Sequence, residues 1–207
     1  MELVRSVDGQ LIAAHWSGPV GPAPVLVFGA IHGDEPDSAR VCDELLLRGV
    51  PGVPLVVLPV LNPDGLAHRR KNNARDVDLN RNFPARNWQR DHRPGYDPGP
   101  APGSEPETQA LVKLIDDLAP RLVVAVHQPL RCVNWDGPAD DFAARLAGLA
   151  GLPLQPSIGY PTPGSFGSWL GVDRGVPVVT LELGRAPEPT ATILGLVDAL
   201  AEALVTA

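Results

Sequence analysis

Short runs of apolar residues recur along the chain, separated by segments in which polar and apolar residues mix. Four of these runs are rich in Val and Leu and have the length of buried strands. They are Val25–Phe28, Leu55–Val60, Leu122–Val126 and Val178–Leu183. Continuous apolar runs of this kind are typical of parallel sheets covered on both faces, so we expect these four to pair in one sheet.

Between these runs, apolar residues recur with the spacing of amphipathic helices. Segment 36–48 has proline in its first turn and Gly49 directly after its end, which are a start and a stop signal. The sequence "SEPE" predicts a capping box made by Ser104 and Glu107, before a helix that continues through "TQALVKLIDDL". Two further helices are expected at 139–150 and 189–206.

Two short segments, Leu3–Val7 and Leu11–Trp16, precede the first buried run and are separated by "DGQ", which predicts a hairpin. After them, strands and helices alternate, which is typical of an α/β fold. We therefore predict a three-layer sandwich with a mixed, largely parallel sheet and helices on both faces. We expect one domain over residues 1–207.

Residues 61–103 show no clear periodicity, and this stretch is much longer than a usual connection. It contains the polar motifs "NPDG" and "DVDLNRNFP". Long connections with such residues are usually functional. We expect the stretch to form part of a site.

The composition argues against some classes of binding partner and indicates the cellular compartment of the protein. With 44% hydrophobic and 20% charged residues the chain is typical of a globular protein, and its formal charge of −7 argues against nucleic acid or an anionic membrane as partner. No apolar run approaches the roughly 18 residues of a membrane span, and the first residues lack the apolar part of a signal peptide. Cys42 and Cys132 form no CxxC pair and are expected as buried thiols, which predicts a cytoplasmic protein.

Side chains able to bind a metal or a proton follow three of the apolar runs. His32 and Glu35 come shortly after the first, His127 ends "LVVAVH", and Glu182 lies near the end of "VPVVTLEL". Ligands of open α/β sheets bind at the carboxyl ends of the strands, so we expect these side chains to meet at one rim. Gly33 allows a sharp turn that lets His32 and Glu35 both face one ion.

This set of side chains suits a single catalytic Zn²⁺ ion. His32, Glu35 and His127 provide three ligands and leave a fourth tetrahedral position for water. Zinc lowers the pKa of such a water to roughly 7 and polarises a carbonyl group. Glu182 can then take the proton of the water and pass it to the leaving nitrogen as a general base.

Several motifs stand in the order found in zinc carboxypeptidases of the M14 type. They are "HGDE", "NPDG", "DVDLNRNFP", "SEPET", His127 at a strand end, "GYPTPGSFGSW" and "TLEL". The chain resembles this family over about residues 25–184. The segments "HQPLRCV" and "GYPTPGSFGSW" are most similar to the murein peptide amidase branch, which recycles cell-wall peptides in the bacterial cytoplasm. The resemblance implies an α/β sandwich around a mixed sheet.

The resemblance assigns the same zinc ligands and the same base, and it implies further roles. Asp78 would hold an imidazole ligand in orientation. Asn80 and Arg81 would bind the free carboxylate of the terminal residue of the substrate, a task that suits the planar guanidinium group. Tyr160 is similar to the mobile tyrosine of the family that covers the bound substrate, and the glycines around it allow a movable loop.

One position departs from the pattern of the family. The family has an arginine before "DLNRN" that stabilises the developing oxyanion. Without gaps this position holds Lys71, with Arg70 beside it, and a shift of the loop by one residue brings either cation to the site. We favour Arg70. Phe166 and Gly167 are implied to lie in the pocket for the released residue, where they define no charge preference.

The leading hypothesis is a zinc-dependent hydrolase that cleaves murein tripeptide, a small peptide with a free C-terminal carboxylate. It would cut the amide between γ-D-glutamate and meso-diaminopimelate, with the reaction class resting on the residues and the substrate on the resemblance. One alternative is an N-acyl amino acid deacylase of the succinylglutamate desuccinylase or aspartoacylase type, which also uses an early H-x-x-E and a later His. Another is a non-catalytic peptide-binding pseudoenzyme. The "DLNRNFP" and "GYPTPGSFG" motifs favour the first hypothesis over the second, and the complete set of ligands and base argues against the third.

Overall fold

The computed structural model describes residues 1–91 and 93–206, and a six-stranded mixed sheet lies at its centre. The four inner strands are parallel, and the two edge strands are antiparallel to their neighbours. In spatial order the strands are β3 (His15–Ser17), β5 (Leu55–Leu58), β4 (Val25–Phe28), β6 (Leu122–His127), β8 (Val178–Glu182) and β7 (Cys132–Asp136). The predicted mixed, largely parallel sheet is confirmed.

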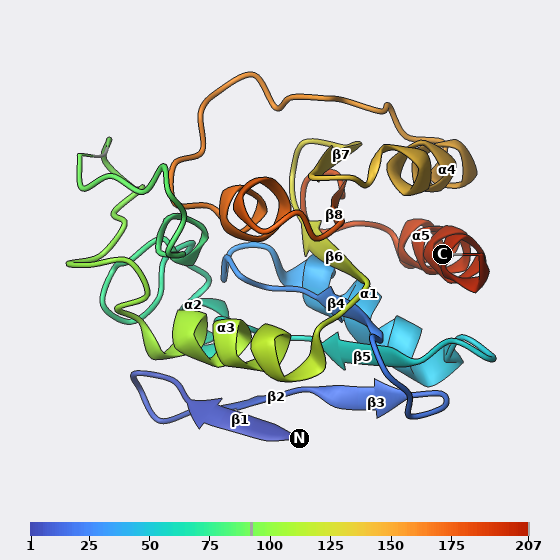
Figure 1. The fold of residues 1–207 in the computed structure, drawn as a ribbon, viewed down its shortest axis with the longest axis horizontal. Coiled ribbons are helices and arrows are strands. Elements are labelled where there is room, and N and C mark those ends of the chain that lie inside the picture. The colour runs from blue at the N-terminus through green and yellow to red at the C-terminus, as the bar shows by residue number, and fades with distance from the viewer. Residues whose placement is uncertain (92, 207) are drawn as a thin grey trace.

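Helices cover both faces of this sheet (Figure 1). One face carries α1 (Pro36–Arg48), α4 (Asp140–Ala150) and α5 (Thr190–Val205). The other carries α3 (Pro106–Leu118), the short π-type helix η2 (Gly167–Asp173) and a separate hairpin of β1 (Glu2–Arg5) and β2 (Leu11–Ala13). The short helices α2 (Pro63–His68) and η1 (Leu79–Arg81) lie in the long connection after β5.

The alternation of side chains along the strands explains the two core clusters. In β4, Val25 and Val27 pack in the cluster under α1 and α5, while Leu26 and Phe28 pack in the cluster under α3 and η2. All four side chains are fully buried, and each such burial contributes roughly 1.5–3 kcal/mol relative to exposure. An inner strand that is apolar on both faces is therefore required here.

Two expectations about elements were wrong, and two elements were not predicted. Segment 11–16 was expected to form one strand of the hairpin. Only Leu11–Ala13 does so, because His15–Ser17 forms the separate strand β3, which pairs with β5 in the main sheet. The capping box is not formed: the Oγ of Ser104 donates to the side chain of Glu105 and accepts from Asn82, so it caps no helix. The sequence patterns also missed β7 and η2.

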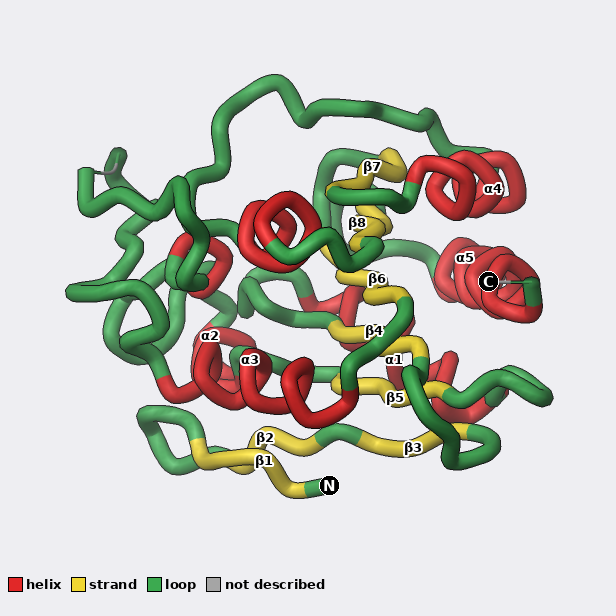
Figure 2. Tube along the Cα trace, in the orientation of Figure 1, coloured by secondary structure: helices red, strands yellow, loops and turns green. Residues whose placement is uncertain are grey.

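The long connection between β5 and α3 lies at one end of the molecule, opposite α4 and α5 (Figures 1 and 2). The carboxyl ends of β4, β6 and β8 point to the same rim, with His127 directly opposite Glu182 in the ladder. Two hydrogen bonds tie segment 82–88 to segment 162–165: the backbone nitrogen of Phe83 donates to the carbonyl of Gly164, and the backbone nitrogen of Gly164 donates to the Oδ1 of Asn87. No helix in the described ranges has the length and apolar character that crossing a bilayer requires.

Candidate metal centre and its cavity

The turn between β4 and α1 brings His32 and Glu35 to the rim of the sheet. Glu35 occupies the cap position of α1, and its side chain makes no hydrogen bond to the helix, so its carboxylate is free to face inward. Gly33 is needed for a different reason from the one expected. Its φ is not positive; instead the backbone of Gly65 and Leu66 lies where a Cβ on Gly33 would stand.

Glu35 lies between two imidazole rings that come from different strands. The Nδ1 of His32 lies 2.7 Å from one carboxylate oxygen, and the Nδ1 of His127 lies 3.0 Å from the other. The ligand atoms of these three residues lie within 4.8 Å of one another, and all three residues are buried. The sequence predicted that they would meet, and the structure brings them together.

Asp78 fixes the orientation of the first of these rings. Its Oδ1 lies 3.1 Å from the Nε2 of His32 and also accepts a hydrogen bond from the backbone of Asn80 at 3.0 Å. Its Oδ2 accepts from the Nζ of Lys71 at 2.5 Å. A proton on the Nε2 of His32, held by Asp78, leaves the Nδ1 lone pair directed at the centre of the cluster.

The charges around His32 favour a cation at this place. Burial lowers the pKa of His32, but the carboxylates of Glu35 and Asp78 outweigh this effect and raise that pKa to about 10. Burial raises the pKa of Glu35, but the two imidazoles lower it to about 2. The same field that stabilises positive charge on an imidazole stabilises a metal cation among these groups.

The donor set fits zinc. Two imidazole nitrogens and one carboxylate are the protein ligands of a catalytic zinc site, and a carboxylate behind one imidazole is the usual support for such a ligand. Asp78 provides that support in this structure. The fit rests on the identity and convergence of the donors.

Glu182 ends β8 beside this cluster, on the wall of a cavity of about 590 Å³. It is 7% exposed, and its Oε2 accepts a hydrogen bond from the backbone of Leu130 at 3.2 Å. Burial raises the pKa of Glu182, and the nearby His127 offsets part of this rise. The other carboxylate oxygen accepts no hydrogen bond from residues 1–91 and 93–206, and such a buried carboxylate is suited to accept and release a proton.

Asn80 and Arg81 line the same cavity. The side chain of Asn80 accepts from the backbone of Phe166 at 2.9 Å, which ties helix η1 to the start of η2. Arg81 is 7% exposed, and its Nη1 donates to the carbonyl of Asn80 at 2.6 Å. Among the described residues no other hydrogen bond of its guanidinium group is found, so the remaining donors are available to a ligand in the cavity.

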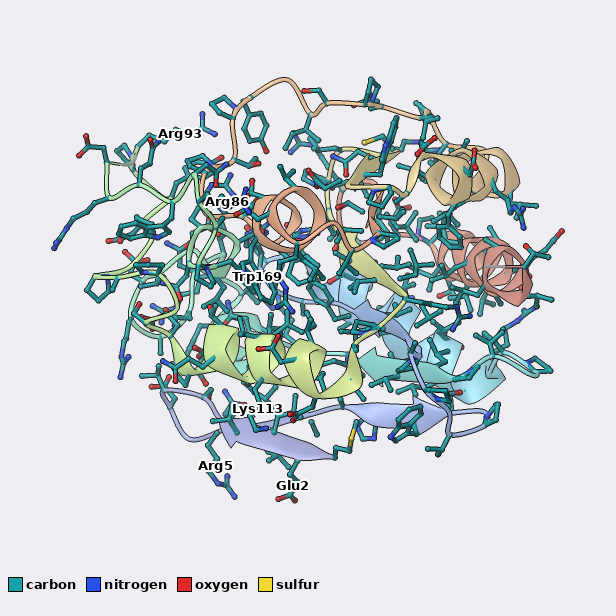
Figure 3. All side chains as sticks on the ribbon, in the orientation of Figure 1. Glu2, Arg5, Arg86, Arg93, Lys113 and Trp169 are labelled. Carbon is teal, nitrogen blue, oxygen red and sulfur yellow. The ribbon has the colours of Figure 1, made fainter. Side chains whose placement is uncertain are left out.

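Tyr160 also lines the cavity and is 40% exposed, on the connection between α4 and η2. The guanidinium carbon of Arg93 lies 5.3 Å from its ring centroid. Figure 3 shows Arg93 on the loop side of the molecule, near this connection. The exposed position is consistent with a residue that moves when a substrate binds.

The structure places the two neighbouring cations differently, and it does not support the preference for Arg70. The side chain of Arg70 is exposed and does not line the cavity, whereas Lys71 does. The Nζ of Lys71 also lies 3.6 Å from the ring centroid of Tyr96. The backbone nitrogen of Arg70 donates to the carbonyl of Gly65, and this hydrogen bond fixes the register of the loop. In this register Lys71, and not Arg70, lies on the cavity wall, so the geometry favours Lys71.

Sequence reasoning missed part of the cavity wall. Asn134 and Asp136 on β7 and Thr180 on β8 line the cavity beyond Glu182. Phe166 and Gly167 also line it, as the resemblance implied. The alternation of polar and apolar residues in "CVNWD" is the signal that could have indicated a half-buried strand here.

Comparisons with known proteins agree with this geometry. The zinc carboxypeptidase family model matches residues 50–137. Murein peptide amidase A of Escherichia coli (strain K12) is 41% identical over 169 residues, covering 72% of this chain and 69% of that protein. The crystal structure of murein-tripeptide amidase from Escherichia coli O157 is 34% identical, with a TM-score of 0.85 over 99% of this chain and 90% of that chain. Thrombin-activatable fibrinolysis inhibitor is 16% identical with a TM-score of 0.80, over 99% of this chain and 69% of that chain, and shares the fold.

Proposed function

Because this chain belongs to the zinc carboxypeptidase family and is a hydrolytic enzyme, we propose that it cleaves murein tripeptide between γ-D-glutamate and meso-diaminopimelate. The observation that carries the proposal is the convergence of three candidate zinc ligands beside Glu182, in a cavity that also exposes Arg81. Similarity to the murein peptide amidases supports the choice of substrate.

In this proposal His32, Glu35 and His127 hold one zinc ion. When bound, zinc supplies a Lewis acid for the scissile carbonyl and lowers the pKa of water. Glu182 accepts the proton of the attacking water at Oε1, because its Oε2 is engaged by the backbone of Leu130. It then passes this proton to the leaving amide nitrogen.

Two cationic side chains have separate roles, one in binding the substrate and one in stabilising the transition state. Arg81 binds the free α-carboxylate next to the scissile bond, with Asn80 beside it. Lys71, rather than Arg70, stabilises the developing oxyanion. An ammonium group has three donors, and Asp78 and the carbonyl of Gly95 engage two of those on Lys71, which leaves one for the reacting oxygen.

Tyr160 covers the bound substrate in the proposed complex, and Asp78 keeps His32 in orientation. We propose in addition that residues 1–207 form one catalytic domain, since both core clusters share the same sheet. Location in the cytoplasm stays a prediction from the sequence.

The test uses the zinc-loaded protein with L-Ala-γ-D-Glu-meso-diaminopimelate, N-succinylglutamate and N-acetylaspartate, with products identified by mass spectrometry. We expect free diaminopimelate and the dipeptide from the first substrate and no turnover of the other two. Turnover of an acylated amino acid alone would instead favour the deacylase hypothesis. Binding of the tripeptide without turnover would favour the pseudoenzyme.

A further inference from the structure

The cavity beside the metal centre reaches segments from both faces of the sheet. Its wall includes Arg81 of η1 and Phe166, which packs in the core cluster under α3 and η2. The wall also includes Arg185 and Ala186, in the connection that leads from β8 to α5. Helix α5 packs with α1 on the opposite face. Arg81 and Arg185 therefore line different sides of one cavity.

The backbone around Arg185 is held against the start of α1. The Nε2 of Gln128 donates to the carbonyl of Gly184 at 3.0 Å, and the backbone nitrogen of Gly184 donates to the carboxylate of Glu188 at 2.7 Å. The backbone nitrogen of Glu188 in turn donates to Asp37 on α1 at 2.8 Å. These bonds fix the chain before and after Arg185, so its side chain starts from a defined point beside the cavity.

The guanidinium group of Arg185 has no partner within the described part of the chain. Across residues 1–91 and 93–206, no hydrogen bond, ion pair or ring contact of this side chain is found. The other lysine and arginine on the described wall are engaged: Lys71 pairs with Asp78, and Arg81 donates to the carbonyl of Asn80. Arg185 is therefore a cation on the cavity wall whose donors are all available to an anion.

The proposed substrate carries an anion on the acyl side of the scissile bond. Its D-glutamyl residue is joined through the γ-carboxyl group, so its α-carboxylate is free, whereas an ordinary α-linked residue has none at this place. Arg81 binds the carboxylate of the released residue in the proposed complex. The acyl part then extends away from Arg81, toward the side of the cavity where Arg185 lies.

The distances allow this contact. Arg185 follows Glu182 by three residues, which separates their Cα atoms by at most about 10 Å. An extended arginine side chain spans roughly 7 Å from its Cα to the guanidinium group. The free α-carboxylate lies roughly 5 Å from the scissile carbonyl carbon when the D-glutamyl chain is extended. The guanidinium group can therefore reach this carboxylate while Glu182 faces the attacking water.

We propose that Arg185 binds the free α-carboxylate of the γ-glutamyl residue on the acyl side of the scissile amide. The planar guanidinium group can hold both carboxylate oxygens. The site therefore selects acyl residues that are joined through their γ-carboxyl group, and it disfavours peptides in which the α-carboxylate is amidated. This inference rests on the proposed function and adds to it a residue that determines specificity on the acyl side.

The experiment compares L-Ala-γ-D-Glu-meso-diaminopimelate with the same tripeptide in which the α-carboxylate of the D-glutamyl residue is a carboxamide. We expect kcat/KM of the zinc-loaded protein to be at least about 10-fold higher for the carboxylate, and Arg185→Gln to reduce this ratio to below about 2-fold. Calorimetric titration with the dipeptide L-Ala-γ-D-Glu and its α-carboxamide measures the same contact without turnover.

Two further variants separate a contact with the substrate from a general effect of charge. Arg131→Gln removes an exposed cation near Gly184 that lies outside this cavity, and we expect it to leave the preference unchanged. Arg185→Lys keeps the charge without the planar group and should retain part of the preference. None of these variants should lower the Tm, because both arginines are exposed.

Retention of the full preference by Arg185→Gln, or equal kcat/KM of the wild-type protein for the two tripeptides, would overturn this inference and leave the proposed function intact. If the wild-type protein hydrolyses neither tripeptide, the proposed function fails, and calorimetry alone decides the inference. Equal affinity for the two dipeptides in that case overturns it, and a weaker affinity for the carboxamide that Arg185→Gln abolishes supports it.

Discussion

Asp78 contacts both a candidate zinc ligand and a candidate oxyanion donor, two roles that the sequence analysis did not connect. One of its oxygens holds His32 and the other holds Lys71, so a single buried carboxylate orients a candidate zinc ligand and a candidate oxyanion donor. A lysine can replace the arginine of the family here because its ammonium group acts as a point charge and needs no planar partner. The position of that charge is set by Asp78 and by the ring of Tyr96.

Replacement of Glu182 by Gln tests the role of the base. The amide has nearly the same shape but accepts a proton poorly, so we expect Glu182→Gln to lower kcat by about 10²–10⁴-fold. Zinc content by elemental analysis should stay at one ion per chain, because Glu182 is not a proposed ligand. Unchanged kcat at full zinc content would remove Glu182 from the mechanism.

A pair of variants decides between the two neighbouring cations. Lys71→Met removes the charge on the cavity wall, and we expect kcat to fall by about 10²–10³-fold, the usual effect of losing an oxyanion donor. Arg70→Met removes an exposed charge outside the cavity and should change kcat by less than about 3-fold. The opposite order of effects would return the role to Arg70. Because Lys71 contacts Asp78, zinc content is measured in both variants.

At the scale of elements, the turn from β4 into α1 depends on contact with α2. The backbone nitrogen of Gly33 donates to the carbonyl of Lys71 at 3.1 Å, and the Cα of Gly33 packs directly on the backbone at Gly65. The turn that carries His32 is therefore held by the connection that carries Lys71. Movement of either segment displaces the candidate ligands.

Gly33→Ala tests this coupling. The added methyl group would collide with the backbone of Gly65 and Leu66, so we expect a loss of roughly 1–3 kcal/mol in the free energy of unfolding. Zinc affinity should fall together with stability. Gly148→Ala is the matched control, because a Cβ at Gly148 on α4 meets no atom within 4 Å, and it should be neutral or stabilising. Equal behaviour of the two variants in thermal unfolding would contradict the coupling.

The elements that the sequence predicted well are those whose pattern is set by burial alone. Val25–Phe28 and Pro36–Arg48 have the predicted bounds, because a strand apolar on both faces and a capped amphipathic helix leave little choice. The edge strand β7 was missed because one of its faces lines a cavity and carries Asn134 and Asp136. The predicted capping box does not form because the hydroxyl oxygen of Ser104 accepts a hydrogen bond from the side chain of Asn82, which is distant in the sequence.

The candidate site also has a part that the sequence could predict and a part that depends on tertiary contacts. The meeting of His32, Glu35 and His127 could be predicted because strand ends bring them to one rim. The choice between Arg70 and Lys71 could not, because it depends on the register of a loop fixed by tertiary hydrogen bonds.

At the scale of the whole molecule, the metal centre connects distant parts of the chain. His32 and Glu35 belong to the connection after β4, and His127 ends β6, about ninety residues later. These two strands are neighbours at the centre of the sheet. The ligand set exists only when both strands are paired, so zinc binding and folding of the central sheet are coupled.

Removal of zinc is therefore expected to lower the stability of the whole fold. A ligand that binds only the folded state at 100 times its Kd adds about 2.7 kcal/mol, and for a chain of this length each kcal/mol shifts Tm by about 2–4 °C. Chelation with dipicolinate should then lower Tm by roughly 5–10 °C in calorimetry, and added zinc should restore it.

The ligand variant Glu35→Gln and the base variant Glu182→Gln separate metal binding from other effects of the chelator. The first should have a low Tm that zinc no longer raises, because one of three ligands is weakened. The second should respond to zinc like the wild-type protein. A zinc-dependent rise of Tm that survives Glu35→Gln would show that the ion stabilises the fold at another place, and these three residues would lose their proposed role.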